Sequence, residues 1–151
     1  MTTNKPRILF LSTGDATRGL IAEGFLRNFT ADRFDIVSVG VDPSTSNPLA
    51  SAVMMEADID ISGQKPRSVA QSLKERFGHV ITICDTAIER NPIFPFALGV
   101  GHWSVVDPNS ADGLPEQKTE VFRRVRDEIK DKVKQFIDDN AQIKASELSI
   151  P

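Results

Sequence analysis

Residues 8–18 read ILFLSTGDATR, and this stretch decides the fold. The apolar run Ile8–Leu11 predicts a short buried strand, and Ser12–Asp15 after it has the composition of a turn. The apolar residues that follow recur at helical spacing, at Ile21, Ala22, Phe25, Leu26 and Phe29. The stretch therefore predicts a buried strand that leads through a tight turn into an amphipathic helix.

Strand and helix patterns continue to alternate along the chain. Apolar, β-branched runs predict three more strands, at residues 34–40, 79–84 and 101–106. Helical patterns occupy residues 47–57, 68–76 and 115–139, while the prolines within residues 85–98 predict mainly a loop. Such alternation is typical of a parallel sheet with helices on both faces. The predicted fold class is thus α/β: a single-domain three-layer sandwich built on a four-stranded parallel sheet.

Length and composition exclude several classes of function. The 151 residues suffice for one domain, which we assign to residues 1–140, followed by a weakly patterned tail at residues 141–151. Lys and Arg number 18 and Asp and Glu 21, so the net charge of -3 provides no attraction for nucleic acid or an anionic membrane. The N-terminus has too short an apolar run for a signal peptide, and no apolar run is long enough to span a bilayer. We therefore expect a cytoplasmic protein.

The loop between the first strand and its helix is the first candidate site. Ligands of parallel sheets bind at the carboxyl ends of the strands, where backbone N–H groups of such a turn point into one concavity. Arg18 can direct two donors at a tetrahedral oxyanion. In the alternative interpretation, this is an ordinary turn in which Gly14 relieves the backbone and Asp15 or Thr17 caps the helix. The candidate anion-binding residues are Ser12, Thr13, Gly14, Asp15, Ala16, Thr17 and Arg18.

Segments beyond this loop occur in an order that resembles a known family. They are residues 22–27, 47–50, 58–64, 80–85, 102–108 and 121–129. With residues 8–18 they resemble the low-molecular-weight protein tyrosine phosphatase superfamily, the arsenate reductase branch being nearest. Members of the phosphotyrosine phosphatase branch usually carry tyrosine directly after their Asp-Pro pair. Here Asp107-Pro108 is followed by Asn109, and the chain contains no tyrosine, which favours the arsenate reductase branch.

The resemblance implies three catalytic roles in the loop and beside it. In family members a loop cysteine attacks phosphorus or arsenic as a thiolate, an arginine holds the oxyanion and an aspartic acid protonates the departing oxygen. By position these roles fall on Ser12, Arg18 and Asp107. A serine hydroxyl is far less acidic than a thiol and needs a neighbouring base, and we expect His79 and His102 at the starts of strands, away from the loop. We therefore name no catalytic residue and expect a pseudoenzyme.

Cys84 is the only cysteine. Thioredoxin-coupled arsenate reductases need two further cysteines besides the nucleophile; Cys84 matches the first of these, and Asn91 stands in the place of the second. With one thiol no intramolecular disulfide can form. Two interpretations of Cys84 remain: a reactive thiol that binds arsenite, a soft metal or glutathione, or a small buried hydrophobic residue at a strand end.

The first functional hypothesis is a non-catalytic relative of arsenate reductase that keeps the oxyanion pocket. Such a protein binds phosphate, arsenate or sulfate as a sensor or carrier, or engages a phosphorylated protein. Asp15 stands where the branch typically has asparagine, so its carboxylate is expected to weaken anion binding unless it points away as a helix cap. We expect no cofactor, no nucleic-acid partner and no membrane partner, and the oligomeric state stays open.

Two alternatives stay open beside this hypothesis. In one, the fold is a protein-interaction scaffold whose pocket is occupied by Asp15 paired with Arg18. In the other, the protein is an enzyme with altered chemistry, in which Ser12, Asp15, Thr17 and Asp107 supply oxygen ligands to a hard cation such as Mg²⁺. The spacing of those four residues is not specific for a metal, so we predict no metal site.

Overall fold

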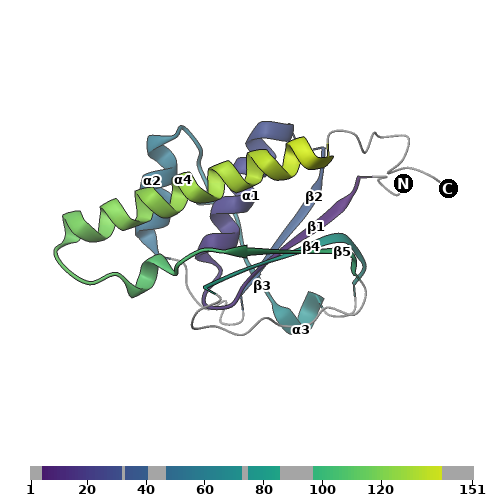
Figure 1. Ribbon diagram of the computed structural model, residues 1–151, viewed down its shortest axis with the longest axis horizontal. Coiled ribbons are helices and arrows are strands. Elements are labelled where there is room, and N and C mark those ends of the chain that lie inside the picture. Colours follow the sequence, from purple (N-terminus) through teal and green to yellow (C-terminus); the bar gives the residue numbers. More distant parts are fainter. Residues whose placement is uncertain (1–4, 32, 41–46, 73–74, 86–96, 141–151) are drawn as a thin grey trace.

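The computed structural model describes residues 5–31, 33–40, 47–72, 75–85 and 97–140, and its core is one parallel β-sheet (Figure 1). The strands are β1 (Arg7–Ser12), β2 (Asp35–Gly40), β3 (Arg67–Ser68), β4 (Phe77–Cys84) and β5 (Ala97–Ser104). The helices are α1 (Thr17–Thr30), α2 (Pro48–Glu56), α3 (Val69–Ser72), the 3-10 helix η1 (Pro108–Ser110) and α4 (Pro115–Asn140). Among these described helices none is long and apolar enough to cross a membrane.

The predicted fold class is confirmed, with three differences in detail. The sheet has five strands rather than four, because the two polar residues of β3 pair with the end of β2 and carry no apolar run that would signal a strand. Strand β5 begins four residues before the predicted start at Gly101, since it pairs along the whole of β4, from Phe77 to Cys84. The helix predicted at residues 68–76 is the short α3; residues 73–74 lie outside the described residues.

The side chains of β1 alternate between two hydrophobic cores, which is what a strand covered on both faces requires. Ile8 and Phe10 belong to the core formed with α1, α2 and α4, whereas Leu9 and Leu11 pack with Val37, Val39 and Val80 on the other face. Val69 of α3 lies against that second core. Helices therefore cover both faces of the sheet, as predicted (Figure 1).

The strand order places the candidate loop at the centre of the sheet's carboxyl edge. The order is β3-β2-β1-β4-β5, so the chain builds outward from β1 in one direction and then returns to add β4 and β5 on the other side. Ligand crevices of doubly wound sheets form where the strand order reverses in this way. Ser12, the last residue of β1, pairs with Gly40 of β2 and Ile83 of β4, so the loop that follows it begins at this reversal.

Helix α4 packs its buried stripe of Phe122, Val125, Ile129 and Val133 into the core, and an ionic cluster joins its first half to α2. Arg123 Nη2 lies 2.9 Å from Glu56 Oε2, and Arg126 Nη1 lies 2.8 Å from Glu56 Oε1. Hydrogen bonds from Arg123, with a further contribution from Arg126, lower the pKa of Glu56 to about 2.

This cluster predicts a specific dependence of stability on pH. Because the pKa of Glu56 falls from 4.5 to about 2 on folding, its contribution is present above pH 4.5 and is lost as the pH falls towards 2. We expect Glu56→Gln to lower the melting temperature at neutral pH and to have almost no effect near pH 2. Glu128→Gln, an exposed change on α4, the helix that carries Arg123 and Arg126, serves as the control, and thermal unfolding across this pH range is the measurement. A Glu56→Gln effect that is equal at both ends of the range contradicts the assignment.

Candidate functional site

The seven candidate anion-binding residues form one loop between β1 and α1. Four of them, Ser12, Ala16, Thr17 and Arg18, are buried, and the other three are partly exposed. Thr13 N donates to Ile83 O at 3.3 Å, which ties the loop to β4. The loop therefore presents Thr13, Gly14 and Asp15 to solvent, over a buried arginine.

Arg18 is the most deeply placed charge of the site. Its side chain is 1% exposed, and Nη1 donates to the carbonyl oxygen of Val105 at 2.8 Å. Nη2 lies 3.9 Å from Asp107 Oδ2. The segment after β5 thus brings Asp107 to the guanidinium, as the resemblance implied. A guanidinium carries five N–H donors in a fixed planar fork, which is the geometry that recognises tetrahedral oxyanions.

Asp107 stands directly over the loop at Gly14. A Cβ at residue 14 would lie 3.1 Å from Asp107 Oδ2 and 3.5 Å from Arg18 Nη2, so glycine leaves the space in which the carboxylate and the guanidinium approach each other. The other oxygen, Oδ1, accepts a hydrogen bond from Asn109 N at 2.9 Å and caps η1. One oxygen of Asp107 therefore fixes the side chain, and the other faces the site.

Asp15 is turned away from the arginine. Its Oδ1 accepts from Thr17 N at 3.0 Å, at the start of α1, and its Oδ2 accepts from Asn109 Nδ2 at 2.9 Å. Both oxygens are occupied, and in the described part of the chain the carboxylate beside Arg18 is that of Asp107. Asp15 thus bonds the first N–H of α1 from the position before the N-cap Ala16, and this geometry differs from the alternative in which Asp15 fills the pocket by pairing with Arg18.

Two residues that the sequence interpretation did not assign to the site complete its rim. Asn109 connects Asp15 to Asn47, because its Oδ1 accepts from Asn47 Nδ2 at 2.9 Å. The pattern Asn47-Pro48 predicts a helix N-cap, and Asn47 does cap α2 by accepting a hydrogen bond from Leu49 N. The departure from tyrosine after Asp107-Pro108 was the one sequence signal that pointed to Asn109. The rim thus links the loop, η1 and the start of α2.

Ser12, in the predicted place of the nucleophile, is completely buried. Its Oγ accepts a hydrogen bond from Gly19 N at 2.8 Å. A Cβ at residue 19 would lie 3.0 Å from that oxygen, so glycine at this position lets the hydroxyl approach the helix backbone. The described partner of Ser12 Oγ is a backbone N–H, which cannot accept the proton that a serine nucleophile must lose.

Cys84 and His102 lie together at the ends of two neighbouring strands. The expectation that His102 begins a strand is wrong: the β4–β5 register pairs it with Thr82, two residues before the end of β5. Its Nδ1 is 2.8 Å from Thr82 Oγ1, and its Nε2 is 3.8 Å from the sulfur of the fully buried Cys84. Asn91, the position compared with a second redox cysteine, lies outside the described residues. Within those residues no three His, Cys, Asp or Glu side chains gather as a metal centre would need.

Residues 7–148 match the family described as low molecular weight phosphotyrosine protein phosphatase. The chain belongs to this family. Arsenate reductase from Halalkalibacterium halodurans is 39% identical over 133 residues, which cover 88% of this chain and 96% of that protein. Arsenate reductase from Bacillus subtilis is 35% identical over 129 residues, covering 85% and 93%.

A solved structure described as an arsenate reductase in the phosphate binding state has a TM-score of 0.74 and 28% identity, and the match covers 92% of this chain and 99% of that one. These similarities confirm the arsenate reductase branch of the low molecular weight phosphatase family. In this member of the family the loop position of the nucleophile holds Ser12, and Cys84 is the only thiol in the sequence.

Proposed function

We propose that this protein binds a free tetrahedral oxyanion, such as phosphate, arsenate or sulfate, in the loop Ser12–Arg18 and does not turn it over. The supporting observation is the buried guanidinium of Arg18, held beneath the loop by the carbonyl of Val105. The N-terminus of α1 adds partial positive charge at the same place. An oxyanion at this loop meets a fixed cation in a site shielded from water, where charge-assisted hydrogen bonds are strong.

The absence of turnover follows from the chemistry of Ser12. A cysteine in this position loses its proton readily, because its ordinary pKa of about 8.5 is lowered by a helix N-terminus and a neighbouring arginine. A hydroxyl in the same field stays protonated. Ser12 Oγ accepts a hydrogen bond from Gly19 N and so supports the first turn of α1; among the described residues its partner is this N–H and not a base. The role that remains for this pocket is binding, as in a sensor or carrier of the anion.

A free oxyanion suits the rim better than a phosphorylated protein does. The hydrogen bonds from Asn47 to Asn109 and from Asn109 to Asp15 join three segments at the mouth of the loop. A phosphorylated side chain brings its own backbone to the mouth and requires these segments to separate. A small anion takes the place of Asp107 beside Arg18 and leaves these hydrogen bonds intact.

Thermal unfolding with phosphate, arsenate, sulfate and chloride tests this proposal. A ligand at about 100 times its Kd stabilises the folded protein by about 2.7 kcal/mol, which raises the melting temperature by several degrees in a domain of this size. We expect the three oxyanions, and not chloride, to produce this shift. Arg18→Ala should abolish it. Asp107→Asn removes a carboxylate 3.9 Å from the guanidinium and should strengthen phosphate binding about tenfold.

The Asp107→Asn variant separates loss of the anion site from loss of the fold, since its effect has the opposite sign to that of Arg18→Ala. No oxyanion shift in either the wild type or Asp107→Asn contradicts binding. A phosphotyrosine peptide that binds as tightly as phosphate contradicts the preference for a free anion. Turnover of arsenate or acetyl phosphate by the wild type, lost in Arg18→Ala, contradicts the absence of catalysis.

A further inference from the structure

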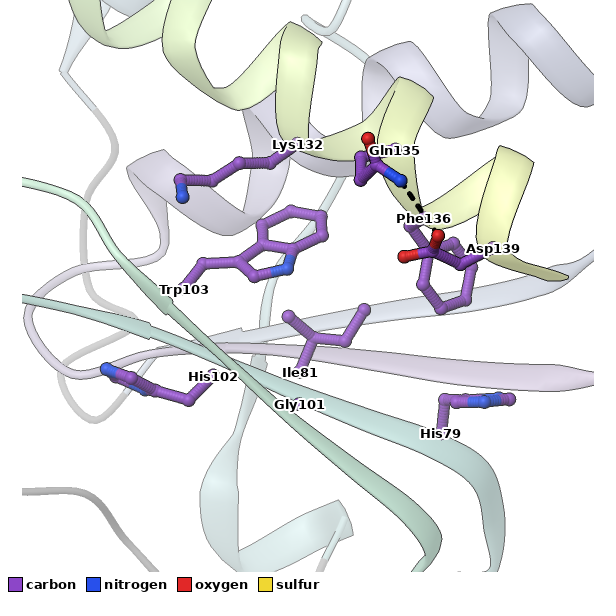
Figure 2. A pocket seen from close by; sticks show the side chains of 9 residues that line it. All are labelled: His79, Ile81, Gly101, His102, Trp103, Lys132, Gln135, Phe136 and Asp139. Atoms are coloured by element: carbon purple, nitrogen blue, oxygen red, sulfur yellow. Dashed lines mark hydrogen bonds between the residues drawn. The ribbon is translucent and has the colours of Figure 1, made fainter.

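A groove lies on the face of the sheet that α4 covers, between strands β4 and β5 and the last turns of α4 (Figure 2). Its volume is about 490 Å³, within the range of small-molecule sites. The floor is formed by Ile81 and Gly101, which are neighbours in the β4–β5 register. A Cβ at residue 101 would make an ordinary contact with Ile81 at 3.5 Å. The missing side chain of Gly101 therefore leaves this floor open, although the backbone there does not require glycine.

Two aromatic rings, each only partly buried, wall this groove, and both are braced from behind. Trp103 packs against Phe10 with ring centroids 5.6 Å apart. Phe136 packs against Phe34 at 6.4 Å and meets His79 edge-on at 5.4 Å. Because these contacts hold the rings in place, the two side chains lose little conformational entropy when a ligand binds. The groove is thus a preformed aromatic slot (Figure 2).

The charges of the groove are separated along α4. Lys132 extends beside Trp103, whereas Asp139 lies at the Phe136 end and accepts a hydrogen bond from Gln135 at 2.8 Å (Figure 2). The two charged residues are seven positions apart, about 10 Å along the helix axis. Burial lowers the pKa of His79, so its imidazole is neutral at neutral pH. Among the described residues Lys132 makes no ion pair, and it is the cation that faces the groove.

We propose that this groove binds a small planar aromatic molecule that carries one anionic group. The aromatic part lies over the Gly101 floor between Trp103 and Phe136, where flat apolar surface is buried against rings. The anionic group lies at Lys132. Asp139 repels an anion at the opposite end and therefore sets the orientation. None of these residues belongs to the loop Ser12–Arg18, so this site stands independently of the proposed oxyanion function.

The protein carries its own reporter for this site, because Trp103 is the only tryptophan and there is no tyrosine. The probe is 8-anilinonaphthalene-1-sulfonate, with N-phenyl-1-naphthylamine as the same ring system without the sulfonate. We expect the sulfonate probe to quench Trp103 emission saturably at one site, and excess phosphate to leave this binding unchanged. Lys132→Met should weaken the sulfonate probe about tenfold and leave the neutral probe unaffected.

Two further variants complete the test. Lys134→Met removes an exposed ammonium that lies over Phe29 outside the groove, and should change neither probe. Gly101→Val places two methyl groups on the floor and should weaken both probes. If Gly101→Val does not fold, Lys132→Met and Lys134→Met, each measured with both probes, still test the proposal. Absence of saturable quenching overturns the proposal, as does a Lys132→Met effect equal for both probes or equal to that of Lys134→Met.

Discussion

Replacing Ser12 with cysteine is expected to convert this protein into a phosphatase for a small acyl phosphate. The new sulfur takes the place of an oxygen that lies 2.8 Å from Gly19 N, at the N-terminus of α1 and above Arg18. Each of these features favours the thiolate over the thiol. The larger sulfur atom also fits, because Gly19 has no Cβ to crowd it.

The rest of the reaction uses groups already present. The thiolate attacks phosphorus in acetyl phosphate, the bond to the acetyl oxygen breaks, and Asp107 is placed to supply a proton to the departing acetate. Water then hydrolyses the phosphocysteine and releases phosphate. We expect Ser12→Cys to release phosphate at least about 1000-fold faster than the wild type, since in the described part of the chain the partner of the hydroxyl is a backbone N–H that cannot act as a base.

Ser12→Ala measures the background release of phosphate in this assay. The double variant Ser12→Cys/Arg18→Ala measures the release that the new cysteine produces without the guanidinium of Arg18. Phosphate release that is equal in Ser12→Cys and Ser12→Ala would show that the loop no longer holds a phosphoryl group in line with residue 12. Release by the wild type at the rate of Ser12→Cys would show instead that the serine itself is a competent nucleophile. Serine in place of the loop cysteine would then not abolish activity.

Gly40→Ala is expected to lower the stability of the protein and to disrupt the proposed anion site. Gly40 ends β2 beside Ser12, and a Cβ there would lie 2.8 Å from Ala16 N and 3.0 Å from Asp15 C. Both are backbone atoms, which cannot rotate aside as the end of a side chain can. The loop must therefore shift away from β2. Overpacking of this kind costs about 2–3 kcal/mol, which lowers the melting temperature by about 5–10 °C.

The same shift should weaken the stabilisation by phosphate, because Asp15 and Ala16 belong to the loop that we propose as the anion site. Gly78→Ala is the matched control: Gly78 is also in a strand, and its Cβ would meet Arg7 O at an ordinary 3.5 Å. Thermal unfolding with and without phosphate measures both effects. An unchanged melting temperature and an unchanged phosphate shift in Gly40→Ala would contradict the close packing of the loop on β2.

The part of the fold closest to the site was predictable from local pattern. The run Ile8–Leu11 is apolar because the strand is buried on both faces, and the helix after it shows its period in the same short window. The long helix predicted at residues 115–139 is α4, whose buried residues recur on one stripe. Local periodicity is visible in sequence because each element must bury its own apolar residues.

Elements whose bounds depend on a partner strand were less predictable. Strand β3 consists of Arg67 and Ser68, which show no strand pattern of their own and pair because the end of β2 is beside them. The misplacement of His102 has the same origin: β5 extends back to Ala97 along β4, and its length is set by that partner. The pairing that brings His102 to Cys84 was therefore invisible to a reading of either segment alone.

By itself, the sequence determined the α/β architecture, the position of the candidate loop Ser12–Arg18, and the presence of Ser12 where the family has its nucleophile. The family resemblance added Asp107 as the position of the general acid, and the structure places its carboxylate 3.9 Å from Arg18 Nη2. Only the tertiary structure decided that Asp15 accepts hydrogen bonds from Thr17 N and from Asn109, 94 positions away, rather than pairing with Arg18. The physical reason is that a carboxylate bonds to whichever donors the folded chain brings within reach, and packing of distant segments selects those donors.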